Sequence, residues 1–121
     1  MTQEEKNLLL KDLFARLPYN VIVHRTYIWG GELKEDDGEL EVFDMDSFLN
    51  ESVEKLNKQG CTIKPYLRPL FSMTEEEKKE LSNYDNAVQR TDFFYSHHID
   101  CRFMVEKGLA LKAPKGMYDL K

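Results

Sequence analysis

The clearest pattern in the sequence is an apolar stripe near the start of the chain. Thr2 and Glu5 have the spacing of a capping box, which predicts that a helix begins directly after Thr2. Proline disfavours helical geometry in the residue before it, so this helix should end at Leu17, before Pro18. Between these limits the apolar residues recur at helical spacing, as expected for one buried face: Leu9, Leu10, Leu13, Phe14 and Leu17.

Short segments rich in β-branched and aromatic residues, or with alternating apolar residues, predict a small sheet. The pair Gly30-Gly31 interrupts the first of these segments, and EDDG (residues 35–38) is a turn signal between two others. Pro65 has no backbone N–H, so it should lie at a sheet edge or at the end of its strand. Four strands are predicted, over residues 20–29, 32–34, 39–44 and 61–66.

Four further helices are predicted from caps and apolar spacing. Residues 47–58 should form a helix that stops at Gly60, and Thr74 with Glu77 forms a second capping box that opens a surface helix. Residues 82–89 should then form a loop. The last two predicted helices cover residues 92–97, capped by Thr91, and residues 101–107, capped by Asp100 and ended by Gly108.

Together these elements predict an α+β fold in one domain of residues 1–121. The sheet should be small and largely antiparallel, and it could form a partial SH3-like barrel. We expect the N-terminal helix to pack on it and the C-terminal helices to cover another side. With 41% hydrophobic and 32% charged residues, the 121-residue chain is typical of a globular protein.

The charge and the apolar runs exclude some classes of protein. A net charge of −5 disfavours a general nucleic-acid surface, which needs clustered Lys and Arg. No apolar run approaches the roughly 20 residues of a membrane span. The start MTQEEKN is acidic and polar, unlike a signal peptide, so a cytoplasmic location is expected.

The segment FFYSHHIDCRF (residues 93–103) holds the most reactive side chains. His97 and Cys101 would share a helix face, as zinc ligands could, but only His24 and Cys61 remain to complete such a site. Cys101 beside a histidine could also be a nucleophile. We favour a third interpretation, in which His97 and His98 close one helix, Asp100 caps the next, and Cys101 packs in the core. This interpretation needs neither metal nor cofactor.

Aromatic residues near the sheet are candidates for a binding groove. Arg68, between Leu67 and Pro69, is either an anion contact in that groove or an ordinary surface charge, and the latter is favoured. The candidate groove residues are Tyr27, Trp29, Tyr66, Arg68 and Phe71.

Several segments together resemble a family of short uncharacterised bacterial proteins found in gut bacteria and in phage-like or mobile-element neighbourhoods. They are LLLKDLFARLPYNV, IKPYLRPLFSMTEEEK, HHIDCR and EKGLALKAPKGMYDL, at residues 8–21, 63–78, 97–102 and 106–120. The family has no known activity, so the resemblance implies no catalytic residues. Its members are similar to H-F-D-Y-R at residues 98–102, with an aromatic residue in place of Cys101, which implies a packing position there.

We therefore expect a non-enzymatic binding or accessory module of a bacterial or mobile-element system. Its partner would be another protein or a second copy of the chain. The alternative is a small thiol or hydrolase-type enzyme that uses Cys101 with His97 or His98. A third and weaker hypothesis is nucleic-acid binding through aromatic and basic residues of the sheet.

Overall fold

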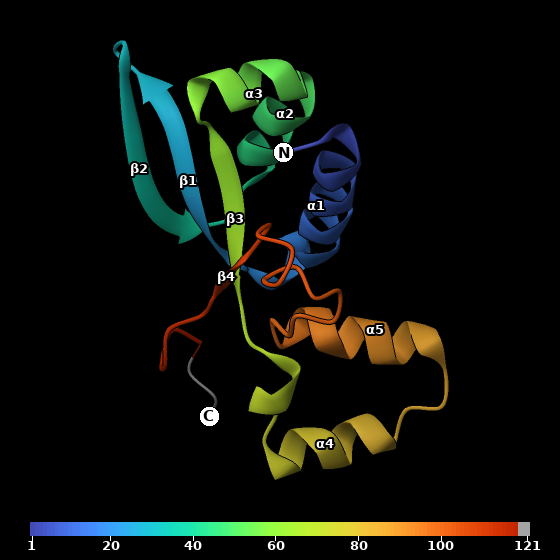
Figure 1. Ribbon diagram of the computed structural model, residues 1–121. Coiled ribbons are helices and arrows are strands. Elements are labelled where there is room, and N and C mark those ends of the chain that lie inside the picture. Colours follow the sequence, from blue (N-terminus) through green and yellow to red (C-terminus); the bar gives the residue numbers. More distant parts are fainter. Residues whose placement is uncertain (119–121) are drawn as a thin grey trace. The chain divides into compact units, whose positions relative to one another are not determined.

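The computed structural model describes residues 1–118, and it groups the chain into two compact units, Met1–Tyr66 and a second that begins at Leu67 (Figure 1). The first unit holds α1 (Gln3–Arg16), a short 3-10 turn η1 (Leu17–Tyr19), β1 (Ile22–Trp29), β2 (Glu32–Glu39), α2 (Val42–Asn50), α3 (Val53–Gln59) and most of β3 (Thr62–Leu67). The second holds η2 (Leu70–Ser72), α4 (Glu75–Ser82), α5 (Ala87–Ser96) and β4 (Leu111–Lys112). The single domain expected for residues 1–121 stays a prediction.

The first helix begins and ends as the sequence predicts. The Glu5 amide donates to the Thr2 hydroxyl over 3.1 Å, and the Thr2 amide donates to the Glu5 carboxylate over 2.8 Å, so the capping box is complete. Leu17 is the C-cap, directly before Pro18. Leu9 and Leu13 are buried, whereas Phe14 is half exposed. The apolar stripe is therefore narrower than the sequence pattern suggests.

A charged pair completes the buried face of α1. Asp12 and Arg16 are fully buried, and the Arg16 Nε atom lies 2.8 Å from Asp12 Oδ2. Their spacing of one helical turn lets both side chains share the face of Leu9 and Leu13. Burial of an ion pair is tolerated because each charge supplies the hydrogen bonds that the other loses with water.

The β1–β2 hairpin differs from the prediction at its turn. Gly30 and Gly31 form the turn with φ values of 60° and 79°, in the left-handed region that glycine adopts most readily. The next strand therefore starts at once and pairs with β1 over eight consecutive positions. The predicted EDDG turn is wrong, because these residues lie inside β2 rather than between two strands.

The strand predicted over residues 39–44 is also wrong. Glu41 and Asp44 form a reciprocal capping box, in which the Glu41 amide donates to Asp44 over 2.9 Å, and α2 starts at Val42. The predicted helix 47–58 is likewise two helices, because Glu51 is extended and Ser52 caps α3. Gly60 ends α3 in the left-handed conformation, as predicted.

The sheet is open and mixed, and its strand order is β2-β1-β3-β4. β1 pairs antiparallel with both β2 and β3, which confirms the α+β class and the largely antiparallel core of the sheet. β4 lies next to the end of β3 that belongs to the second unit, where the Ala113 amide donates to the Leu67 carbonyl. Pro65 is buried and pairs with Val23 inside β3, so the predicted place at the strand end is wrong. The alternative, a place at a sheet edge, stays a prediction.

One face of the sheet carries the core of the first unit. Val23 and Ile63 point to this face, and Figure 1 shows the helices of the unit on this side of the strands. The neighbouring positions, such as His24 and Lys64, point to the other face because side chains alternate along a strand. The buried helical residues on the core face are Leu9, Leu10, Leu13, Met45, Phe48 and Leu56.

In the second unit one predicted helix start is confirmed, and the two helices predicted after it differ from the structure. Thr74 and Glu77 cap α4 as predicted. The predicted loop 82–89 is present but shorter, over residues 83–86, because α5 begins at Ala87 with Asn86 as its cap. The predicted cap at Thr91 is wrong, because Thr91 lies inside α5. Residues 101–107 form turns instead of a helix. Asp100 still binds backbone amides there, of Met104 over 2.7 Å and Val105 over 3.1 Å.

Candidate binding cleft

A cleft of about 560 Å³ lies in the first unit, between the core face of the hairpin and the two short helices α2 and α3. Residues 25–28 of β1 and residues 61–63 at the start of β3 form one wall. The other wall comes from α2 and α3, with Phe43, Ser47 and Phe48 among its residues. This volume falls within the roughly 300–1,000 Å³ of known ligand pockets.

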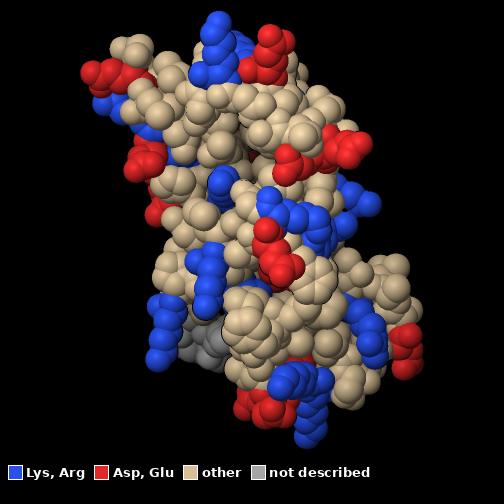
Figure 2. Space-filling model, in the orientation of Figure 1, with Lys and Arg blue, Asp and Glu red and all other residues tan. Residues whose placement is uncertain are grey.

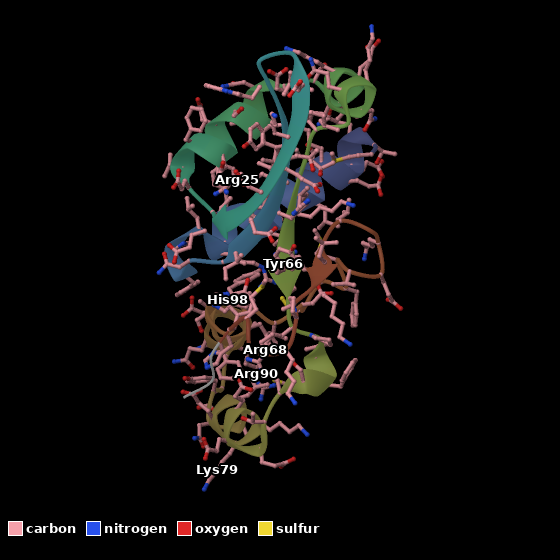
Figure 3. All side chains as sticks on the ribbon, turned by 90° about the vertical axis from the view of Figure 1, so that its left-hand side faces the viewer. Arg25, Tyr66, Arg68, Lys79, Arg90 and His98 are labelled. Carbon is pink, nitrogen blue, oxygen red and sulfur yellow. The ribbon has the colours of Figure 1, made fainter. Side chains whose placement is uncertain are left out.

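Arg25 is the central charged residue of the cleft, and Figure 3 labels it on the hairpin. Its Nε atom donates to Asp44 Oδ1 over 2.9 Å, and its Nη1 atom donates to Asp36 Oδ1 over 3.0 Å. Burial alone would lower the pKa of Arg25, but the bonds to Asp44 and Asp36 outweigh burial and raise it. The guanidinium therefore stays charged, and it ties the hairpin to the start of α2.

Gly38 and Tyr27 make room for this network and extend it. A Cβ atom at Gly38 would lie 2.8 Å from Arg25 Nη1, so the absence of a side chain lets the guanidinium cross β2. The Tyr27 hydroxyl donates to Asp36 Oδ2 over 3.1 Å, and this bond raises the pKa of Tyr27. The phenol consequently stays protonated and does not serve as a base.

Large apolar side chains lie around the charged network of Arg25, Asp36 and Asp44, which we call the floor of the cleft. Phe43 is 75% exposed and Tyr27 is 36% exposed, and both line the cleft. Val42, next to Phe43, and Trp29, on the same face of β1 as Tyr27, are also exposed. Exposed apolar side chains gathered around a hollow are typical of a surface that binds another molecule.

A second polar cluster lies on the opposite face of the sheet. His24 Nδ1 is 2.7 Å from Asp37 Oδ1, and the Tyr66 hydroxyl donates to the same oxygen over 3.0 Å. Glu35 Oε2 lies 3.3 Å from His24 Nε2. The bond to Asp37 is the main cause that raises the pKa of His24, and the same bond lowers the pKa of Asp37. This cluster favours a protonated imidazole between two carboxylates.

The second unit holds a buried ion pair. Arg68, labelled in Figure 3, donates to Glu77 through Nη1 over 2.8 Å and through Nη2 over 2.7 Å. It also donates to the carbonyls of His97 and Ser72. The preference for Arg68 as a surface charge is wrong, because only 6% of the residue is exposed. Its guanidinium already binds an anion, which is Glu77.

The two histidines of FFYSHHIDCRF (residues 93–103) have separate contacts. His97 is the C-cap of α5, as predicted, and its Nδ1 atom lies 2.9 Å from the Phe93 carbonyl oxygen. Its ring stacks on Phe93, whereas the His98 ring stacks on Tyr118 with centroids 3.9 Å apart. Cys101 is half-buried, so the prediction that it packs fully in the core is wrong. A thiol mechanism at Cys101 stays a prediction.

The predicted groove residues fall on both units. Tyr27 lines the cleft of the first unit, Trp29 stands exposed at the hairpin end, and Tyr66 belongs to the cluster of the opposite face. In the second unit Arg68 and Phe71 both line a smaller hollow of about 290 Å³, where Lys112 Nζ lies 5.9 Å from the Phe71 ring centroid. A single groove formed by all five residues stays a prediction.

Sequence reasoning missed the residues that shape the cleft. Arg25 is a charge inside a β-branched and aromatic run, and that was a usable signal that it needs a buried partner. Asp44 is that partner, but its position depends on the start of α2, which the sequence pattern placed in a strand. The position of Phe43 in α2, where it lines the cleft, was missed for the same reason.

Neither metal-ligand clusters nor similarity to known proteins assigns a function to the chain. Within residues 1–118, no three His, Cys, Asp or Glu side chains are grouped so that they could hold a metal ion. None of the helices in this described part combines the length and apolar character that a membrane span requires. No protein-family model, curated protein or solved structure matches the chain.

Proposed function

We propose that this protein is a non-enzymatic binding module whose first unit takes an apolar segment of a partner protein into the cleft between the hairpin and α2–α3. The bacterial or mobile-element setting comes from the sequence resemblance alone. The observation that carries the proposal is the exposed apolar rim of the cleft, with Phe43 and Tyr27, around a floor on which Arg25 is already paired with Asp36 and Asp44.

The pairing of charges on the floor favours an apolar ligand group over a charged one. Arg25 is bound by Asp36 and Asp44, and Lys55 lies 3.1 Å from Glu51. An apolar side chain that enters the cleft would therefore leave no charge buried without a partner. Burial of an unpaired charge is costly, and this cost is avoided here. A small ion would have to compete with these existing partners.

The protonation states favour binding rather than catalysis. The pKa values of Arg25 and Tyr27 are both raised, so the guanidinium stays charged and the phenol keeps its proton. A general base needs a pKa near the working pH so that it can lose and regain a proton. Neither side chain meets this requirement.

A peptide selection tests the proposal. A random peptide library displayed on phage would be selected against the full chain, and the enriched peptides would then be titrated against variants. Phe43→Ser should weaken binding about tenfold or more, because it removes the large apolar side chain that a bound segment would cover and a few such residues carry most of the binding energy. Val88→Ser is the matched control, since Val88 is 78% exposed on α5 in the second unit.

Two results would contradict the proposal. One is a selection that enriches no peptide above the unselected library. The other is enriched peptides that bind the Phe43→Ser variant as tightly as the unmodified protein. Peptides that lose affinity with Val88→Ser instead would place binding on the second unit.

A further inference from the structure

Within residues 1–118 no strand pairs with the outer edge of β2, and the pairing of β2 with β1 is regular. β2 is the terminal strand in the order β2-β1-β3-β4, and seven of its eight residues are exposed. An edge strand presents a row of backbone N–H and C=O groups that can pair with another extended chain. Proteins block such edges with proline, a bulge or charged side chains. β2 contains no proline and pairs with β1 over eight consecutive positions, so only its charges protect the edge, and charges of one sign do not repel a partner of the opposite sign.

The hairpin turn shows which backbone groups of β2 face outward. The Gly30-Gly31 turn, with both φ values positive, is of the two-residue type that makes Trp29 and Glu32 a hydrogen-bonded pair. Hydrogen-bonded and non-hydrogen-bonded pairs alternate along an antiparallel ladder. The N–H and C=O groups of residues 33, 35 and 37 therefore point away from β1, and those of residues 34 and 36 point toward it.

The charge on this edge identifies the kind of strand that it would accept. β2 carries one ammonium group and five carboxylates, a net charge of −4, and Figure 2 shows acidic side chains along the border where β2 lies. Arg25 and His24 offset part of this charge through Asp36 and Asp37. The remaining negative charge repels a second copy of the same edge, and it attracts Lys and Arg on a partner.

We propose that the outer edge of β2 binds a basic extended segment of a partner protein by strand addition. Backbone bonds to residues 33, 35 and 37 would supply the pairing. The carboxylates of Glu35 and Asp37, on the face of the sheet opposite the cleft, would contact the alternating basic side chains of the segment, which also share one face. This surface is separate from the cleft, so the proposal does not depend on the proposed function.

A defined peptide tests the strand addition. The probe is a capped octapeptide, KVKTKVKT, titrated against the full 15N-labelled chain at about 0.1 M salt, with EVETEVET as the charge-reversed control. Leu33→Pro removes one outward N–H without a change of charge and should weaken binding about tenfold. Leu33→Val is the matched control, because it keeps the N–H and should bind within about twofold of the unmodified chain.

Hydrogen exchange on the unmodified protein gives a readout that needs no variant. The peptide should slow amide exchange at residues 33, 35 and 37, while residues 34 and 36 change little because β1 already protects them. Absence of binding, equal binding of EVETEVET, equal affinity of the Leu33→Pro variant, or protection outside β2 would each overturn the proposal. Loss of binding with Phe43→Ser but not with Leu33→Pro would favour the cleft and reject the edge.

Discussion

The buried ion pair between Arg68 and Glu77 gives the most quantitative prediction for stability. The bonds from Arg68 are the main cause that lowers the pKa of Glu77 from 4.5 to about 2. At about 1.4 kcal/mol per pKa unit, this shift corresponds to about 3 kcal/mol that stabilises the folded second unit. The side chains of both residues are nine-tenths buried, so solvent screens the pair little.

Glu77→Gln should remove this contribution. The amide keeps the shape of the carboxylate but leaves the Arg68 charge buried without a counter-charge, so the unit should lose about 3 kcal/mol at pH 7. Because the folded-state pKa is depressed, the stabilisation is fully present above pH 4.5 and is lost as the pH falls toward about 2. The stability difference between the two proteins should therefore shrink over this pH range.

Hydrogen exchange of α4 and α5 is the suitable assay, because the single Trp29 lies in the first unit and would not report on the second. Exchange would be compared for the unmodified chain, Glu77→Gln and the control Glu76→Gln, an exposed residue of the same helical turn. The control should lose less than about 1 kcal/mol, the usual size of a helix-end charge effect. A loss for Glu77→Gln no larger than for Glu76→Gln, or a difference that stays constant from pH 6 to pH 2, would refute the reasoning.

Three further predictions concern single side chains. The NMR titration midpoint of His24 should lie above 6.5, and Asp37→Asn should lower it, because the bond to Asp37 raises the pKa of His24. This bond stabilises the folded state below pH 6.5, and the stabilisation is lost as the pH rises through the folded-state pKa. A midpoint that does not change in Asp37→Asn would contradict the prediction. Asp100→Ala should cost about 1–3 kcal/mol by denaturant unfolding because two backbone amides lose their acceptor, whereas a cost equal to that of the exposed control Glu106→Ala would argue against it. Cys101, which is half-buried, should be alkylated by iodoacetamide no faster than a peptide thiol at pH 7, and faster alkylation would support the thiol enzyme.

The sequence predicted those elements that local chemistry determines. Thr2 with Glu5 and Thr74 with Glu77 start α1 and α4 as expected, because both members of each capping box lie within one helical turn. Gly60 ends α3 for the same kind of local reason. These features could be predicted because they need no knowledge of tertiary contacts.

The errors arose where two local signals competed. Leu40 and Val42 alternate with acidic residues as in a strand, but the capping box of Glu41 and Asp44 starts a helix at Val42, and Arg25 from β1 holds Asp44 in place. EDDG is a turn signal, yet the Gly30-Gly31 turn made the following residues a strand. A tertiary contact, the bond between Arg25 and Asp44, supports the first outcome, whereas the local Gly30-Gly31 turn decided the second. Arg25 could be suspected of needing a partner, but the partner and Phe43 could not be predicted without knowledge of where α2 starts.

Chemical-shift mapping of a selected peptide on the 15N-labelled full chain tests the proposed cleft most directly. A peptide selected against the unmodified protein should perturb the backbone amides around the cleft, namely those of residues 25–28, 43–48 and 61–63. In the Phe43→Ser variant the same perturbation should need at least about tenfold more peptide. Perturbations confined to residues 68–118, or unchanged in the Phe43→Ser variant, would contradict the account.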